Sequence, residues 1–95
     1  MRLKIGRLAA ADVDAIFEYG LENHGPEAAI DYLDRIEAKY RLLLDHSRSG
    51  RAEPELGAGI RSLSCHSHRI YYEIEGETVL IRRIRHKSSN ARRWV

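Results

Sequence analysis

The sequence predicts an α+β domain in which a helical hairpin packs on one face of a small, mostly antiparallel sheet. Three observations support this prediction. Apolar residues recur at helical spacing between residues 13 and 44, and they alternate at strand spacing near both ends of the chain. Gly76-Glu77 separates two apolar-rich segments, as expected for a tight hairpin turn. The expected element order is β-α-α-β-β-β, because helices grouped in the sequence tend to cover one side of an antiparallel sheet.

The size and composition indicate a single globular domain over residues 1–95. Hydrophobic residues make up 43% of the chain and charged residues 32%, which is typical of a folded protein outside a membrane. No apolar run is long enough to cross a bilayer, and the first residues do not resemble a secretory signal. Cys65 is the one cysteine, so no intrachain disulfide can form. We therefore expect a cytoplasmic protein that does not bind membranes.

The first two elements are expected to be a short strand and a helix. Residues 2–8 alternate polar and apolar side chains, which predicts a strand with Leu3 and Ile5 on its buried side. Asp12 then has the properties of a helix N-cap, and Gly25 those of the residue that ends the helix. The apolar stripe of this helix consists of Val13, Ile16, Phe17, Gly20 and Leu21.

A second helix is predicted to start at Pro26, because the first helical turn does not need the amide hydrogen that proline lacks. The short connection between the helices predicts an antiparallel hairpin. Residues 45–59 contain glycine, proline and serine at turn-forming positions, which indicates a loop. The apolar stripe of the second helix consists of Ala29, Ile30, Leu33, Ile36, Tyr40, Leu43 and Leu44.

Three further strands are predicted over residues 60–63, 69–75 and 78–84. In the second of them, Ile70, Tyr72 and Ile74 share one face. The third contains Val79-Leu80-Ile81, which is apolar on both faces and therefore typical of a central strand. Residues 64–68 are expected to be a polar connection.

Charge is unevenly distributed along the chain, although the net charge is only +2. Acidic residues dominate the two predicted helices, whereas residues 82–95 carry six arginines or lysines and no acid. Such a basic end suits an acidic partner, although surface salt bridges without a partner are the alternative. Arg82 and Arg83 should lie on opposite faces of the last strand, one open to a partner and the other needing a carboxylate such as Glu73. The residues predicted to bind such a partner are Arg51, Arg61, Arg82, Arg83, Arg85, His86 and Lys87.

Neither a metal nor a cofactor is expected. Cys65, His66 and His68 lie close together in the sequence, but no fourth ligand stands at a recognisable spacing. RNA cleavage is the sharpest chemical hypothesis for the basic residues. Arg61 and Arg83 would hold the phosphate and His86 would transfer a proton. Lys87 and Tyr71 are candidates for the second acid or base, but the sequence places neither of them beside His86.

The order of these elements, with particular residues, resembles the ParE branch of the RelE/ParE toxin superfamily. The similarity extends over nearly the whole chain. The segments that carry it are residues 10–16 with Tyr19, residues 25–29, Leu42-Leu43, Gly50-Arg51, Glu55-Leu56, residues 59–62, Tyr71-Tyr72 and residues 79–86.

This resemblance implies a toxin of a bacterial type II toxin–antitoxin system, with a helical hairpin packed on a small sheet. It implies a cognate ParD-like antitoxin that wraps the toxin in a hetero-oligomer, DNA gyrase as the target and no enzymatic activity. A RelE-like ribosome-dependent mRNA endonuclease and a non-toxic antitoxin-binding module are the two alternatives. After His86 the sequence Lys87-Ser88-Ser89-Asn90 departs from the usual family continuation, and the sequence assigns no role to residues 88–95.

Overall fold

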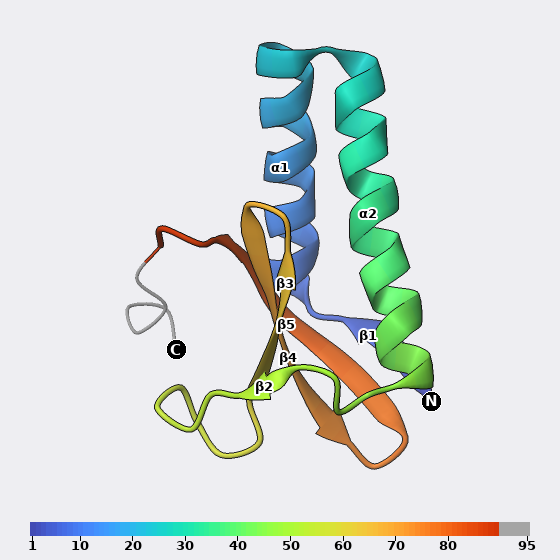
Figure 1. The fold of residues 1–95 in the computed structure, drawn as a ribbon, viewed down its shortest axis with the longest axis vertical. Helices are drawn as coiled ribbons and strands as arrows, with labels where there is room; N and C mark the ends of the chain where they lie inside the picture. The colour runs from blue at the N-terminus through green and yellow to red at the C-terminus, as the bar shows by residue number, and fades with distance from the viewer. Residues whose placement is uncertain (90–95) are drawn as a thin grey trace.

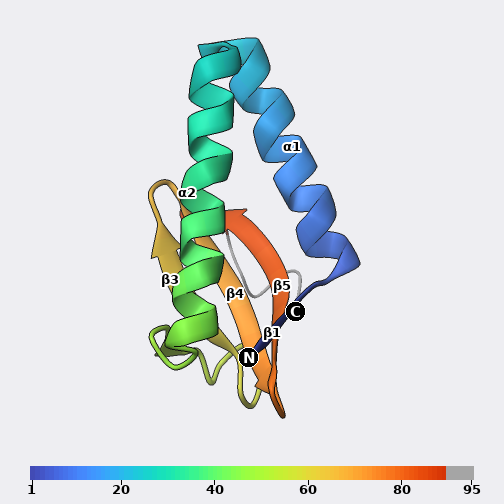
Figure 2. The ribbon, with the colours of Figure 1, turned by 90° about the vertical axis from the view of Figure 1, so that its right-hand side faces the viewer.

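Two helices stand on one side of a five-stranded sheet in a computed structural model that describes residues 1–89 (Figures 1 and 2). The predicted α+β class and helical hairpin are confirmed. The sheet has one strand more than predicted, because two residues of the expected loop pair with the sheet edge. In chain order the elements are β1 (Arg2–Ile5), α1 (Arg7–His24), α2 (Pro26–Asp45), β2 (Arg51–Ala52), β3 (Arg61–Cys65), β4 (His68–Glu75) and β5 (Thr78–His86).

The strands lie in the order β1-β5-β4-β3-β2. Only β1 and β5 are parallel; the other three pairings are antiparallel, so the predicted mostly antiparallel sheet is confirmed. The parallel pairing places Leu3 opposite Val79. β5 lies between β1 and β4, as its apolar run of residues predicted.

The first helix begins earlier than predicted. α1 starts at Arg7, directly after Gly6, whose amide donates a hydrogen bond of 2.9 Å to the Ile81 carbonyl. The prediction that Asp12 caps this helix is therefore wrong, since Asp12 lies inside α1. Helix α2 begins at Pro26 as expected, after Gly25 with a φ of 90° that glycine adopts without steric cost.

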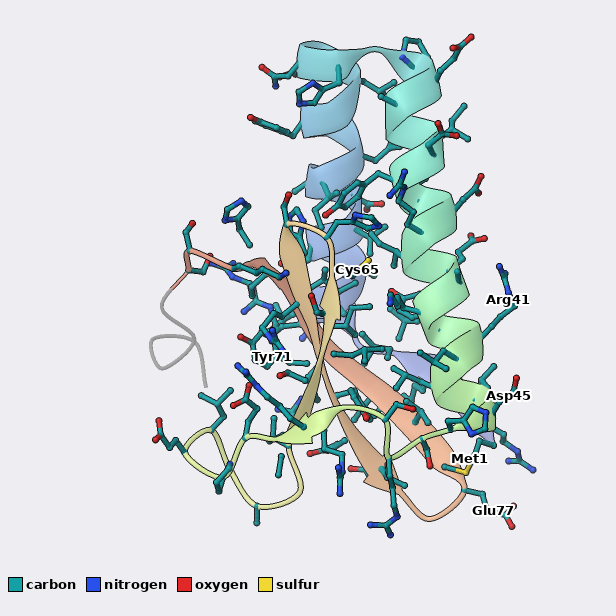
Figure 3. The ribbon with its side chains drawn as sticks, viewed as in Figure 1. Met1, Arg41, Asp45, Cys65, Tyr71 and Glu77 are labelled. Carbon is teal, nitrogen blue, oxygen red and sulfur yellow. The ribbon has the colours of Figure 1, made fainter. Side chains whose placement is uncertain are left out.

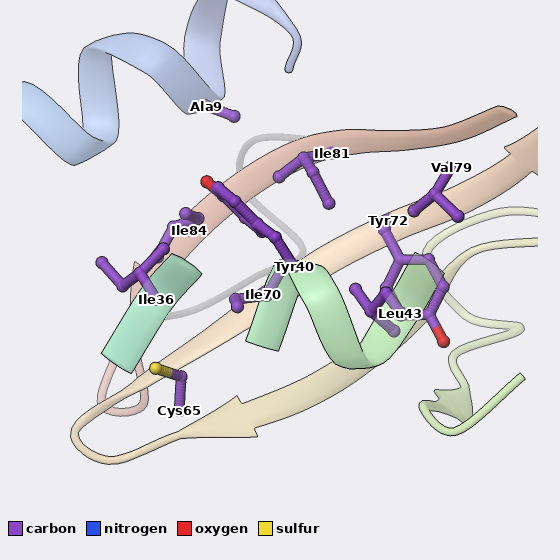
Figure 4. Packing of buried hydrophobic residues seen from close by; sticks show 10 residues of the cluster. All are labelled: Ala9, Ile36, Tyr40, Leu43, Cys65, Ile70, Tyr72, Val79, Ile81 and Ile84. Carbon is purple, nitrogen blue, oxygen red and sulfur yellow. The ribbon is translucent and has the colours of Figure 1, made fainter. Parts of the chain in front are cut away.

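The core lies between α2 and the covered face of the sheet, where α1 adds Ala9 (Figure 4). Three predicted core positions are wrong, and one of them, Leu21 of α1, is 39% exposed. Ile5 is 42% exposed, because β1 is a four-residue edge strand that ends there. Ile30 is 52% exposed, because the apolar stripe of α2 is wider than the face that meets the sheet. The core cluster consists of Ala9, Ile36, Tyr40, Leu43, Cys65, Ile70, Tyr72, Val79, Ile81 and Ile84.

A β-bulge in β5 changes the predicted alternation of side chains. Tyr71 pairs with Arg83 and Tyr72 pairs with Ile81, so Arg82 is an extra residue without a partner in the register. The bulge allows Ile81 and Ile84 to be buried in the same core although two residues separate them. With strict alternation, one of the two arginines between them, Arg82 or Arg83, would point into the core. The bulge keeps both of them out of it.

The sheet face away from the helices is less open than the sequence suggested. Tyr71 and Leu56 are buried there, and a hollow of about 260 Å³ is lined by both of them together with Ile60, Arg82 and Arg83. Leu56 belongs to the segment between β2 and β3, which therefore covers part of this face. Within residues 1–89, neither helix is long and apolar enough to cross a membrane.

Candidate functional site

A groove of about 620 Å³ lies between the helical hairpin and the C-terminal end of β5. Its helical walls present mainly small and apolar side chains, and its strand end presents Arg85 and two histidines. Tyr19 lies at this groove and is 63% exposed. The lining residues are Asp12, Ala15, Ile16, Tyr19, Gly20, His24, Ala28, Ala29, Tyr32, Ser67, His68, Ile84, Arg85, His86 and Ser89.

The groove exists because β1 is shorter than β5. β1 pairs only with residues 78–81, so the remainder of β5 has no neighbouring strand on that edge. Asp12 of α1 accepts a hydrogen bond of 2.9 Å from the Ile84 amide at this edge. A backbone amide that would otherwise lack a partner is thereby satisfied.

Asp12 also holds Arg83, one of the predicted binding residues. The Arg83 guanidinium donates from Nε to Oδ2 over 2.8 Å and from Nη2 to Oδ1 over 3.0 Å, a bidentate ion pair. Both side chains are largely buried, and hydrogen bonding to Asp12 raises the pKa of Arg83. The structure thus places Arg83 in an internal contact that joins α1 to β5.

The other predicted arginines differ in what they contact. Arg82 pairs with Glu73 at 3.2 Å, the carboxylate that the sequence suggested for one of the two neighbouring arginines. Arg51 pairs with Glu53 at 3.2 Å, and the side chains of Arg51 and Arg82 are 64% and 50% exposed. These exposed ion pairs contribute little to stability, so both cations remain accessible to a partner.

Two predicted arginines have no carboxylate among the described residues. Arg61 donates a hydrogen bond of 2.8 Å to the Gly50 carbonyl. Arg85 makes no ion pair within residues 1–89, and its Nε atom is buried without a hydrogen-bond acceptor. Lys87 is exposed beside this end of β5. Arg85 is therefore a predicted arginine without a carboxylate partner among residues 1–89, and it pairs with Arg69 in the register of β4 and β5.

Two histidines at the strand end of the groove were not recognised together from the sequence. His68 and His86 are paired in the register of β4 and β5, with ring centroids 5.4 Å apart. The Tyr32 hydroxyl lies 2.6 Å from His68 Nδ1, and the Ser88 amide donates to His86 Nδ1 over 3.1 Å. Burial lowers the pKa of His68, and the proximity of His86 lowers it further. Counting the hairpin register outward from Gly76-Glu77 would have paired His68 with Arg85, because the bulge at Arg82 shifts the register by one residue, so the sequence contained no direct signal for this pair.

The residues of the RNA-cleavage hypothesis lie in different surroundings. His86 lines the groove, Arg83 is bound to Asp12, and Arg61 contacts the loop before β2. Tyr71, a candidate second acid or base, lies on the far side of the sheet from α2 (Figure 3) and helps to line the smaller hollow. The described part of the chain also contains no group of three side chains arranged to bind a metal.

Sequence comparison connects this architecture to a family. The sequence model of the ParE toxin of the type II toxin–antitoxin system, parDE, matches residues 3–91. The chain belongs to the ParE toxin family. The predicted resemblance to the RelE/ParE superfamily is thereby confirmed, and the match includes every helix and strand except the first residue of β1.

Individual relatives and a solved structure agree with this assignment to the ParE family. The chain is 35% identical over 89 residues to Toxin ParE1 of Caulobacter vibrioides, covering 94% of this chain and 92% of that toxin. It is 35% identical over 78 residues to Toxin ParE3 of the same organism, covering 82% and 78%. The structure of a chromosomal ParDE system from P. aeruginosa superposes with a TM-score of 0.78 at 29% identity, covering 90% of this chain and 95% of that one.

Proposed function

We propose that this ParE toxin is neutralised by a cognate ParD-like antitoxin bound in the groove, and that the free toxin inhibits DNA gyrase. The observation that carries the proposal is the ParE family match over residues 3–91, together with a groove that these residues form. The family description places the ParE toxin in the parDE toxin–antitoxin system, which supports a partner encoded beside this chain.

The shape and lining of the groove support an antitoxin segment as its occupant. Ala15 and Ala28 present little side-chain volume at the groove, so a partner backbone can approach closely there. Ala29 is buried and packs against Gly20 where the two helices meet. Tyr19 adds an exposed aromatic side chain of the kind enriched at protein interfaces. An amphipathic segment would bury its apolar face here, as helices do in other apolar grooves.

The exposed cations outside the groove support a separate contact with the target. Arg51 and Arg82 hold only surface ion pairs, so an acidic protein surface or bound DNA could replace Glu53 and Glu73 as their partners. The separation of Arg61, Arg83 and His86 favours binding over RNA cleavage as the mode of action. The antitoxin and the target would then use different parts of the toxin.

Inducible expression followed by separate supercoiling and translation assays tests this proposal. We expect growth arrest and relaxed plasmid DNA while translation continues, with recovery when the adjacent gene product is co-expressed. Arg51→Glu with Arg82→Glu should abolish the arrest yet preserve binding to that gene product. Arg41→Glu, at an exposed position on α2, is the control and should remain toxic.

Two outcomes would contradict the gyrase proposal and support an alternative. Cleavage of ribosome-bound transcripts, relieved by His86→Ala, would support the endonuclease. Normal growth with a tight complex to the adjacent gene product would support a non-toxic antitoxin-binding module.

A further inference from the structure

We propose that Arg69 and Arg85 form a carboxylate-binding site on the outer face of the sheet, the face away from the helices on which Tyr71 lies (Figure 3). The occupant would be an aspartate or glutamate side chain from an acidic segment of the target protein. This inference rests on the proposed function, because that proposal assigns the cations outside the groove to the target.

The pairing of the strands brings the two arginines together. Arg69 of β4 is opposite Arg85 of β5 in the register, and Ser64 of β3 is opposite Arg69. The residue after Arg69 and the residue before Arg85 are buried in the core, so alternation places both arginines on the outer face. Arg85 borders the groove, but its side chain therefore belongs to the other side of β5. Directly opposite residues have Cβ atoms about 5 Å apart, which allows two guanidinium groups to contact one carboxylate.

Arg69 is oriented by a hydrogen bond on this face. Its Nε donates to the Ser62 hydroxyl over 3.1 Å, and that hydroxyl donates to the Glu53 carboxylate over 2.6 Å. Ser62 is 1% exposed, so this contact lies beneath the surface and fixes where the Arg69 side chain runs. Within residues 1–89, Arg69 forms no salt bridge, and its Nε is the atom that makes this hydrogen bond. Its two terminal nitrogens are therefore left for a ligand.

Arg85 has no acceptor inside the described chain. It makes no ion pair within residues 1–89, and its Nε is buried without a hydrogen-bond partner there. A buried donor without an acceptor destabilises the free protein. Like charges directly opposite each other on neighbouring strands are also destabilising. An anion bound between the two arginines would relieve both effects, which favours a ligand at this position.

The neighbouring residues of the outer face favour a single carboxylate over a nucleic-acid strand. A nucleic acid needs several free cations spaced along its phosphates. Here Glu53 is already paired with Arg51, and Glu73 with Arg82. A phosphate backbone that extended beyond the two opposed arginines would meet these glutamates, whereas one side-chain carboxylate needs only the two arginines.

Two short peptides and the isotope-labelled full chain test the site. The probes are acetyl-Gly-Glu-Gly-amide and the same peptide with glutamine in place of glutamate, titrated while the Nε–H resonances of Arg69 and Arg85 are followed by NMR. We expect the glutamate peptide to bind about tenfold more tightly than the glutamine peptide, because charge-assisted hydrogen bonds form only with the carboxylate. Both Nε–H resonances should shift together.

Matched variants connect the result to the arginine pair. Arg69→Gln and Arg85→Gln should each remove the discrimination between the peptides. Arg82→Gln, which changes the arginine paired with Glu73, should preserve it. Arg85→Gln should also raise the melting temperature of the free toxin by about 2–5 °C, because it removes a like-charge pair. An arginine with a merely structural role would give a lower melting temperature when it is replaced.

Expression in cells identifies the partner that supplies the carboxylate. Arg69→Gln with Arg85→Gln should weaken growth arrest and preserve binding to the adjacent gene product. Loss of that binding would assign the carboxylate to the antitoxin and overturn the proposal.

The peptide and stability measurements can overturn the site as well. Equal affinities for the two peptides, no binding of either, or a lower melting temperature in Arg85→Gln would do so. A short RNA that binds the two arginines more tightly than the glutamate peptide would also contradict it. Growth arrest with relaxed plasmid DNA would still support the proposed function in any of these cases.

Discussion

At the scale of single residues, Asp12 connects the helical hairpin to the sheet. One carboxylate accepts two hydrogen bonds from Arg83 and one from the Ile84 amide. The sequence alone indicated a helix cap, because an acidic residue at the start of an amphipathic stripe is a common capping signal. The actual partners are more than 70 residues away along the chain, a separation that local pattern analysis does not address.

Replacing this carboxylate should destabilise the fold. Asp12→Asn removes the negative charge that the Arg83 guanidinium contacts in a largely buried site, which should cost about 2–3 kcal/mol in the free energy of unfolding. Urea denaturation monitored by circular dichroism would measure the change. Asp14→Asn, at an exposed position in the same helix, is the matched control and should change stability by less than about 0.5 kcal/mol. Equal stability of Asp12→Asn and the wild type would show that the ion pair contributes nothing.

The pKa of His68 predicts how stability responds to acid. Its folded-state pKa lies below the ordinary value of 6.5, so the unfolded chain binds more protons at mildly acidic pH. The free energy of unfolding should therefore fall as the pH decreases below about 6.5. His68→Gln should show a shallower fall between pH 7 and pH 5 than the wild type.

The control for this pH dependence is His46→Gln, at an exposed position. It should keep the wild-type slope in urea titrations at several pH values. If His68→Gln keeps the wild-type dependence of the free energy of unfolding on pH, another group must cause that dependence.

At the scale of elements, Tyr72 ties the segment after α2 to the sheet. Its hydroxyl donates to the Ser47 carbonyl at 2.7 Å and accepts from the Gly50 amide at 2.9 Å. Gly50 is needed at this position, because a Cβ atom there would lie 2.6 Å from the same hydroxyl. The side chain of a central strand thereby positions the chain just before β2.

Removal of this hydroxyl should therefore loosen the start of β2. Tyr72→Phe leaves a carbonyl and an amide without their partner, and we expect a loss of about 1–3 kcal/mol in the free energy of unfolding. Hydrogen exchange should accelerate at the Gly50 amide before it does so in β4 or β5. Tyr19→Phe, whose hydroxyl is at an exposed position, serves as the control. Unchanged exchange at Gly50 would contradict the role assigned to Tyr72.

The elements that the sequence predicted well are those specified by local periodicity and turn chemistry. Pro26 marked the start of α2, and Gly76-Glu77 marked the turn between β4 and β5. The start of α1 was missed because residues 2–8 alternate in a way that suits a strand, whereas pairing with Ile81 ends the strand at Ile5. The bulge at Arg82 was missed because an extra residue is defined only by the partner strand.

At the scale of the whole molecule, the basic residues divide into separate groups. Arg51, Arg61 and the basic end of the last strand were predicted from the sequence to bind a partner, with Arg82 and Arg83 on opposite faces of that strand. The structure places Arg85 and His86 at the groove, Arg82 at the hollow on the opposite face, and Arg83 in an internal ion pair. Which cations share a surface depends on the bulge and on β1 ending early, and neither is visible in the charge pattern.

The account centres on the groove as the place where the antitoxin binds this ParE toxin. Hydrogen exchange of the toxin, compared alone and in complex with the adjacent gene product, tests that claim most directly. We expect strong protection in residues 15–20 and 84–89, with little change at Leu56 and Ile60 on the opposite face. Protection confined to that opposite face, with residues 15–20 exchanging as in the free toxin, would contradict it.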